Sequence, residues 1–239
     1  MSGLFAVVPI FSSRNVPMQA KVGMVFFTSY VMLPLISLEY VSNFDSLLTY
    51  AYLLIVEFFI GVMFGLIMVI ALSCVFLAGA IIDRNIGFSM VSVINPEGTG
   101  NLPVSANLLY TMALMVFFTV DGHHQLFRVL AEMYQFAPVG RGFFNIFGAL
   151  ELVEIMQEAF VLGFKLASPF VITILISNIL LGLLSKAMPG MNVFMLGMPF
   201  KIGVGLFLFI ILVPNYVASY GEVFEWIWEL MTKFMIYIR

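Results

Sequence analysis

A tract of 25 residues, 58–82, contains no charged side chain. A helix that crosses about 30 Å of hydrocarbon needs about 20 apolar residues, whereas a soluble domain rarely needs so long an uncharged stretch. Charged residues make up 10% of the whole chain, and a surface that faces water normally carries about 25%. We therefore expect most of the outer surface to face lipid or other proteins.

Further charge-free runs contain enough apolar residues for spanning or deeply buried helices, at residues 22–38, 98–120, 166–185 and 202–221. With a shorter apolar stretch at 4–11, they predict an all-α membrane protein with five long apolar helical regions. We expect one domain over residues 1–239, because no repeat of fixed period and no large polar region occurs. Stretches rich in Gly and Pro interrupt the runs and predict broken helices at 87–103, 138–142 and 188–199.

The few charges argue against nucleic acid as a partner, because phosphate binding needs clustered Lys and Arg and the net charge is −3. They give no orientation in the membrane either. Alternating loops carry five basic residues on one side and five on the other, namely Arg14, Lys21, Arg84, Lys186 and Lys201 against Arg128, Arg141, Lys165, Lys233 and Arg239. The single cysteine, Cys74, excludes a disulfide within the chain and a cysteine-based zinc site.

The segment 87–103, with the sequence GFSMVSVINPEGTGNLP, joins two apolar runs. Its apolar side chains are Phe88, Met90, Val93 and Ile94. A strong turn signature follows at Asn95-Pro96-Glu97-Gly98. The residues alone leave two interpretations open. The segment is an ordinary loop packed against its neighbours, or it is a plug, since a hydrophobic constriction blocks water and ions.

Both histidines occur in the run Asp121-Gly122-His123-His124. Adjacent helical positions point about 100° apart, so the pair is a poor chelate and we predict no metal site. The run is typical of a polar helix end near the membrane boundary, where Gly122 relaxes the backbone. Two alternatives stay open: a proton relay, and an intramembrane metalloenzyme that binds metal through both histidines.

Charged side chains recur at helical spacing in two stripes. The first consists of Glu151, Glu154, Glu158 and Lys165, and the second of Glu222, Glu225, Glu229 and Lys233. We favour a solvated face for the first stripe, with a channel-facing stripe as the alternative. The second predicts an amphipathic C-terminal segment over 221–239.

Gly61 and Gly65 form a G-x-x-x-G motif in the longest run, which lets two helix backbones approach closely, and Gly182 is a further candidate for close helix packing.

The chain contains no G-x-S-x-G elbow, no P-loop and no metalloprotease motif. We therefore predict no enzymatic activity, no catalytic residue and no cofactor.

A series of short motifs runs through the chain in a fixed order. The first half contains Pro9, Arg14-Asn15-Val16-Pro17, Lys21, Gly61, Gly65, Ala78-Gly79, Gly87-Phe88-Ser89, Asn95-Pro96, Pro103, Gly122-His123 and Pro138-Val139-Gly140. The second half contains Asn178, Leu181-Gly182-Leu183-Leu184, Pro189, Asn192, Phe194, Gly197, Pro199 and Val204-Gly205. In this order and spacing, over about residues 4–220, the chain resembles the FliR family of flagellar export-gate proteins.

The resemblance implies a subunit of the flagellar type III protein-export gate, in the bacterial cytoplasmic membrane at the basal body. It also implies long helical hairpins within a helical multi-subunit assembly. The implied partners are FliP-type and FliQ-type gate subunits, an FlhB-type switch protein, unfolded exported flagellar proteins and membrane lipid. In that family the matching segment 87–103 is a plug that closes the channel. The residues expected to form the closure in this chain are Phe88, Met90, Val93, Ile94, Asn95 and Pro96.

The chain departs from the family pattern in the plug. Asn95 stands where the family often has Asp, and Met90 and Val93 stand where aromatic residues are frequent, which predicts a softer and more deformable seal. Two other functions remain open. One is the related virulence-type (injectisome) gate of the SctT family. The other is a small-molecule secondary transporter, which would predict inverted repeats that the sequence does not show.

Overall fold

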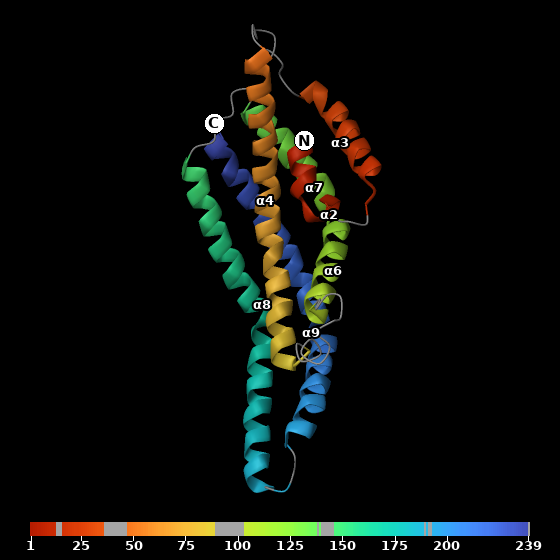
Figure 1. Ribbon diagram of the computed structural model, residues 1–239, viewed down its shortest axis with the longest axis vertical. Helices are drawn as coiled ribbons and strands as arrows, with labels where there is room; N and C mark the ends of the chain where they lie inside the picture. The colour runs from red at the N-terminus through yellow and green to blue at the C-terminus, as the bar shows by residue number, and fades with distance from the viewer. Residues whose placement is uncertain are drawn as a thin grey trace. The chain divides into compact units, whose positions relative to one another are not determined.

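The computed structural model describes residues 1–12, 16–35, 47–88, 103–137, 139, 146–188, 190 and 193–238. Within these ranges the secondary structure is helical and contains no strand (Figure 1). The helices are α1 (Ser2–Val7), α2 (Pro9–Ser12), α3 (Met18–Met32), α4 (Leu47–Ile86), α6 (Val104–Thr119), α7 (Gly122–Phe136), α8 (Ile146–Ala187) and α9 (Val193–Phe234). Short 3₁₀ turns occupy Leu33–Leu35 and Met235–Ile238.

Three segments are long and apolar enough to cross a membrane, namely Leu47–Ile86, Leu150–Ala187 and Met195–Ile238. The pair α6 and α7 passes the same test together but is bent by 67°. The expectation of an all-α membrane protein is confirmed. The expected long helix over 22–38 is wrong in its length: α3 has 15 residues, which rise about 22 Å at ~1.5 Å each and fall short of ~30 Å of hydrocarbon.

Three prolines lie inside the long helices: Pro169 in α8, and Pro199 and Pro214 in α9. A proline removes one backbone donor, and apolar helices tolerate it where other groups satisfy the freed carbonyl. The predicted break over 188–199 is therefore too long, because α9 already begins at Val193 and continues through Pro199.

The chain forms two compact units. Unit 1 contains Met1–Ala71, Phe117–Glu158 and Glu222–Arg239, and unit 2 contains Leu72–Val116 and Ala159–Gly221. Helices α4, α8 and α9 each contribute residues to both units. The expectation of one domain over residues 1–239 stays a prediction.

Unit 1 has an aromatic core. Phe64 on α4 and Phe234 on α9 pack edge to face with ring centroids 5.8 Å apart, and Phe117 lies 5.4 Å from Phe224. Within the segment 221–239, residues 221–234 form the end of α9 and Met235–Ile238 form a 3₁₀ turn. The buried side chains of the segment are Val223, Phe224, Ile227, Leu230, Met231, Phe234, Met235 and Ile238, while Glu222, Glu225 and Glu229 are exposed.

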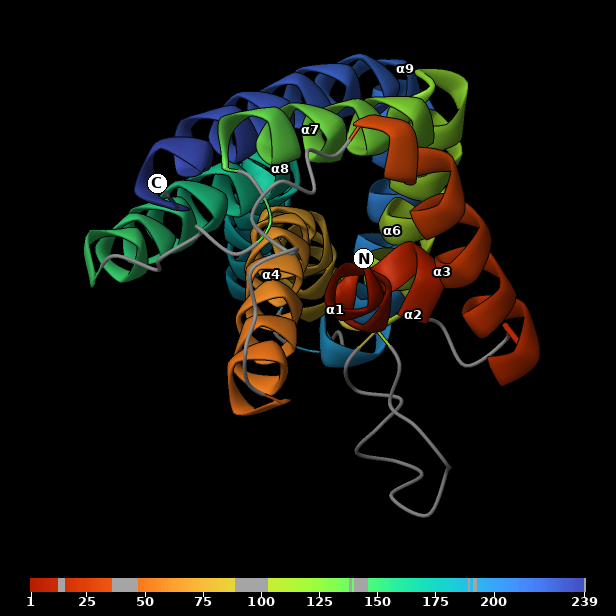
Figure 2. The same ribbon diagram turned by 90° about the horizontal axis from the view of Figure 1, so that it is seen from above.

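In the same unit, α1 packs against α4 through glycines (Figure 2). A Cβ atom at Gly3 would overlap the carbonyl oxygen of Phe58, and one at Gly61 would lie 3.0 Å from the backbone nitrogen of Leu4. At Gly65 it would lie 2.8 Å from the Cβ of Val7. The G-x-x-x-G motif of α4 thus faces α1 of the same chain.

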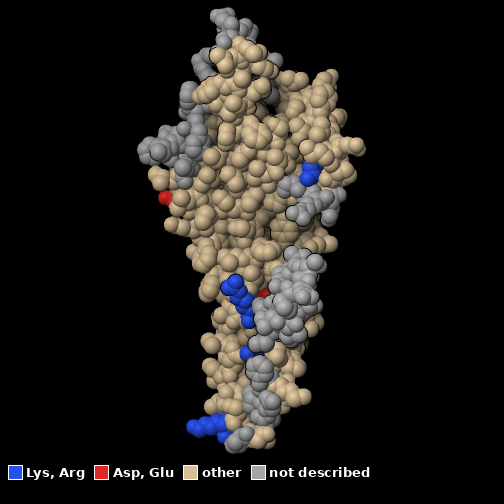
Figure 3. Space-filling view, in the orientation of Figure 1, with Lys and Arg blue, Asp and Glu red and all other residues tan. Residues whose placement is uncertain are grey.

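Large apolar side chains remain exposed on several helices of both units. On α3 the exposed fractions of Phe26 and Phe27 are 75% and 68%, and on α9 that of Ile210 is 75%. Lys, Arg, Asp and Glu cover little of the described surface in Figure 3. Soluble monomers seldom expose contiguous apolar surface of this extent, so these side chains face lipid or other subunits.

Candidate functional site

The end of α4 flanks the segment expected to act as a plug. Of the expected plug residues, Phe88 is described and half-buried, while Met90, Val93, Ile94, Asn95 and Pro96 lie outside the described residues. Gly87 has a φ of +102°, which suits glycine because it has no Cβ. Its N–H donates to the carbonyl of Asp83 at 3.0 Å and closes the last turn of α4.

Asp83 joins the end of α4 to the beginning of α6. Its side chain is 3% exposed, and its two carboxylate oxygens accept a hydrogen bond from the backbone N–H of Ser105 at 2.9 and 3.1 Å. The first N–H groups of a helix have no partner within the helix, so this carboxylate satisfies one of them in α6. Arg84, the oppositely charged neighbour in the sequence, is exposed to solvent or lipid.

The same two helices touch through their backbones one turn earlier. A Cβ atom at Gly79 would overlap the backbone of Ala106 and lie 2.8 Å from the Cβ of Ala106. Gly79 on α4 and Ala106 on α6 are both fully buried in unit 2. The contact explains why glycine stands at this position.

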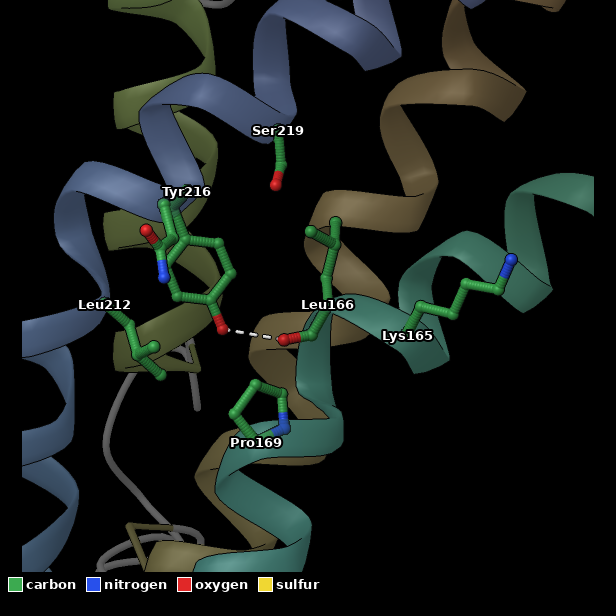
Figure 4. A pocket seen from close by; sticks show the side chains of 7 residues that line it. Lys165, Leu166, Pro169, Leu212, Tyr216 and Ser219 are labelled. Carbon is green, nitrogen blue, oxygen red and sulfur yellow. Dashed lines mark hydrogen bonds between the residues drawn. The ribbon is translucent and has the colours of Figure 1, made fainter.

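Unit 2 also contains a pocket of about 130 Å³ between α8 and α9 (Figure 4). It is lined by Lys165, Leu166, Pro169, Leu212, Asn215, Tyr216 and Ser219. The Tyr216 hydroxyl donates to the carbonyl of Leu166 at 2.7 Å, and the Ser168 hydroxyl donates to that of Lys165 at 2.7 Å. Pro169 has no N–H to donate to the carbonyl of Lys165 four residues earlier, and the Ser168 hydroxyl occupies that carbonyl. The Tyr216 hydroxyl adds a bond from α9 to the neighbouring carbonyl.

Tyr216→Phe is expected to lower the free energy of unfolding by about 0.5–1.5 kcal/mol, because it removes one hydrogen bond to the Leu166 carbonyl. Thermal unfolding of the protein in mild detergent measures the effect. Tyr110→Phe is the matched control in unit 2, since the Tyr110 hydroxyl has no hydrogen bond among the described residues. Equal unfolding midpoints for the two variants would contradict this role of Tyr216.

The first charged stripe is divided between the two units, with the three glutamates in unit 1 and Lys165 in unit 2. Glu158 accepts a hydrogen bond from the Trp226 indole at 2.9 Å, and Glu151 accepts one from the Tyr237 hydroxyl at 3.1 Å. Two glutamates of α8 therefore bind the C-terminal part of the chain, although Glu158 is exposed, as are Glu154 and Lys165. The channel-facing role of the stripe stays a prediction.

The run from Asp121 to His124 forms the bend between α6 and α7. Asp121 has a φ of +54°, and a Cβ atom at Gly122 would overlap the ring of Phe117. The left-handed residue is thus Asp121, whereas the sequence suggested that Gly122 relaxes the backbone.

The histidines of this run lie close together. Their ring centroids are 4.1 Å apart at a 37° tilt, and His124 Nδ1 lies 3.3 Å from an Asp121 carboxylate oxygen. One ligand atom from each of Asp121, His123 and His124 falls within 4.8 Å of the others. The three groups thus lie close enough together to hold a metal ion, although adjacent histidines lack the i, i+4 spacing of a helical pair of ligands. The absence of a metal site stays a prediction.

Gly182 was expected at a close helix contact, but a Cβ atom added there would meet no atom of the described residues within 4 Å. Its role in close helix packing stays a prediction.

Two contacts that the sequence did not suggest are those of Asp83 with Ser105 and of Tyr216 with Leu166. Both join residues far apart in the chain, and the only sequence signal is an Asp that ends the longest uncharged tract.

The long apolar helices and their exposed apolar side chains define an integral helical membrane protein whose surface faces lipid or other subunits. The family described as "Bacterial export proteins, family 1" matches residues 1–227, and the chain belongs to this family.

Curated relatives extend over nearly the whole chain. It is 28% identical to the flagellar biosynthetic protein FliR of Bacillus subtilis (strain 168), over 98% of this chain and 91% of the relative. It is 29% identical to the protein of the same name from Escherichia coli (strain K12), over 95% of this chain and 87% of the relative. The FliR protein of Aquifex aeolicus (strain VF5) is 27% identical, over 91% and 86% of the two chains.

Proposed function

We propose that this protein is a core subunit of the flagellar type III protein-export gate in the bacterial cytoplasmic membrane, at the flagellar basal body. The observation that carries the proposal is the family match over residues 1–227, together with relatives named flagellar biosynthetic protein FliR over more than nine tenths of the chain. The helices that are long enough to span a membrane support the location.

The proposed partners are FliP-type and FliQ-type gate subunits and an FlhB-type switch protein. Exposed apolar side chains on α3, α8 and α9 support an assembly of several subunits, because α3 is apolar yet shorter than a spanning helix. The subunit acts as part of a conduit for unfolded flagellar proteins rather than as an enzyme, and the energy for export comes from other components.

Purification from native membranes in mild detergent, followed by mass spectrometry, tests this function. Recovery of FliP-type and FliQ-type subunits in one stable particle supports the gate, and the flagellar or injectisome proteins that accompany it identify the system. Recovery of the chain alone, while a control membrane complex survives the same treatment, contradicts the proposal.

Within this function, the segment 87–103 is proposed to close the conduit at rest, with Met90 and Val93 among its apolar contacts. Met90→Gly combined with Val93→Gly is expected to raise ion leakage across the membrane several-fold, because a hydrophobic constriction excludes water only while its side chains fill it. Leakage is measured as ion flux in cells with equal amounts of assembled gate. Thr99→Gly is the control in the same segment, and an unchanged flux in the double variant would remove the plug assignment.

A further inference from the structure

The pocket of unit 2 lies at one end of a stretch of α8 that matches the thickness of a bilayer. Lys165 and Lys186 enclose the 20 uncharged residues 166–185, within a segment long and apolar enough to span a membrane. At ~1.5 Å each these residues rise about 30 Å, which is the thickness of the hydrocarbon. Lys165 therefore lies at the level of the lipid headgroups, where the side chain of a lysine at the end of a span places its charge.

The lining of the pocket is polar toward the headgroups and apolar toward the hydrocarbon. Contacts between α8 and α9 show that the two helices are antiparallel, because they pair Leu166 with Tyr216, Phe170 with Phe209, and Leu181 with Gly197. Ser219 follows Tyr216 on α9, so it lies with Lys165 on the headgroup side. Pro169 and Leu212 lie on the hydrocarbon side, and Figure 4 shows Ser219 above the hydrogen bond of Tyr216 and Pro169 below it.

Three polar side chains of the pocket have no partner in the described part of the chain. The Lys165 ammonium, the Asn215 amide and the Ser219 hydroxyl make no hydrogen bond or ion pair with any described residue. An ammonium, an amide and a hydroxyl together supply one positive charge and several hydrogen-bond donors. This set suits an anion with several acceptor oxygens, which forms charge-assisted hydrogen bonds.

The pocket has room for such an anion. Its volume is about 130 Å³, whereas a water molecule takes up about 30 Å³ in the liquid. Lys165 and Asn215 are exposed, so the pocket opens to the surface of unit 2. In Figure 4 the Ser219 hydroxyl points toward the Tyr216 hydroxyl, while the Lys165 side chain extends away from both. A lysine ammonium sits on a flexible four-carbon stem, so it reaches an anion at the mouth of the pocket when that stem turns.

We propose that this pocket binds the phosphate of an anionic phospholipid. The Ser219 hydroxyl and the Asn215 amide donate to phosphate oxygens, and Lys165 balances the negative charge. Pro169 and Leu212 contact the glycerol and the first carbons of the acyl chains. A lipid is favoured over a carboxylate of another subunit, because the cation lies at headgroup level and the apolar wall lies on the hydrocarbon side. The inference goes beyond export and requires only the location in a membrane.

The test measures the affinity of the full-length protein in mild detergent for added phosphatidylglycerol, by native mass spectrometry. Lys165→Gln removes the charge, and it is expected to weaken binding of the first lipid about fivefold, which corresponds to about 1 kcal/mol. Lys165→Arg keeps the charge and is expected to bind nearly as the wild type does. Ser219→Ala removes one donor and is expected to weaken binding as well, which provides a second variant if Lys165→Gln folds poorly.

Lys186→Gln is the matched control. It removes the same charge from the other end of the same uncharged stretch, and Lys186 does not line the pocket. Its affinity for phosphatidylglycerol is therefore expected to equal that of the wild type. Equal losses in Lys165→Gln and Lys186→Gln would show a general attraction between lipid and positive charge, and would overturn the proposal. Wild-type affinity in both Lys165→Gln and Ser219→Ala would overturn it too.

Other probes separate the possible occupants. Phosphatidylcholine carries the same phosphate beside a compensating cation and is expected to bind more weakly; equal affinity would overturn the assignment to an anionic lipid. Inorganic phosphate that displaces phosphatidylglycerol at equal concentration would overturn the assignment to any lipid.

A partner carboxylate is tested on the particle purified from native membranes. A carbodiimide that joins Lys165 to a carboxylate of another subunit would assign the pocket to protein and overturn the proposal, whereas phosphatidylglycerol retained without this cross-link supports it. The affinity measurement uses the purified chain, so it holds whether or not gate subunits accompany the protein. Failure of the lipid site is thereby distinguished from failure of the proposed function.

Discussion

Replacing Gly79 with alanine is expected to lower the free energy of unfolding of this protein by about 1–3 kcal/mol, the usual cost of overpacking a tight core. The added Cβ would overlap the backbone of Ala106, and a backbone cannot rotate away as the end of a side chain can. Helices α4 and α6 would have to separate, which also stretches the hydrogen bonds between Asp83 and Ser105.

Gly203→Ala in α9 is the matched control, because its added Cβ would meet no atom of the described residues within 4 Å. In a helix interior, alanine is favoured over glycine by about 0.5–1 kcal/mol. The two substitutions are therefore expected to shift the thermal midpoint in mild detergent in opposite directions. A midpoint for Gly79→Ala at or above that of the wild type would contradict the tight contact of α4 with α6.

The sequence predicted the helical membrane class well, because uncharged length is a direct physical requirement of the bilayer. It predicted helix ends poorly. The uncharged tract over 58–82 lies within α4, which starts at Leu47 and includes Glu57, because a helix continues beyond the hydrocarbon as long as its backbone bonds are kept. In the uncharged run over 22–38, α3 ends at Met32 and a 3₁₀ turn follows at Leu33–Leu35, since the absence of charge does not by itself extend an α-helix.

The candidate site was predicted only in part. Helical spacing placed Glu151 and Glu158 on one face of α8, but it could not show that Tyr237 and Trp226 donate to them, because these partners lie 86 and 68 residues away. Asp83 ends the longest uncharged tract, and Arg84 beside it in the sequence carries the opposite charge. The actual partner is a backbone N–H 22 residues further on, which no side-chain pattern reveals.

Enlarging the two glycines of the G-x-x-x-G motif is expected to displace α1 from α4. Gly61→Ala and Gly65→Ala together would place Cβ atoms 3.0 Å from the Leu4 nitrogen and 2.8 Å from the Val7 Cβ. Helices in apolar surroundings associate mainly through close packing, so loss of fit has no large hydrophobic term to offset it. The side chains that α1 buries, among them Leu4 and Phe5, would then become accessible.

The displacement is measured as the rate at which a thiol at position 5, introduced by Phe5→Cys, reacts with a maleimide. The native Cys74 is fully buried and is replaced by alanine to remove its background. A cost of about 1–3 kcal/mol in packing corresponds to roughly a 5–150-fold change in the population of the displaced state, so we expect labelling to accelerate at least about fivefold. Gly23→Ala on α3 is the control in unit 1, because its added Cβ meets no atom of the described residues within 4 Å. Equal labelling rates in the double variant and the control would show that α1 docks on α4 without needing the two glycines, and the motif would then have to serve another contact.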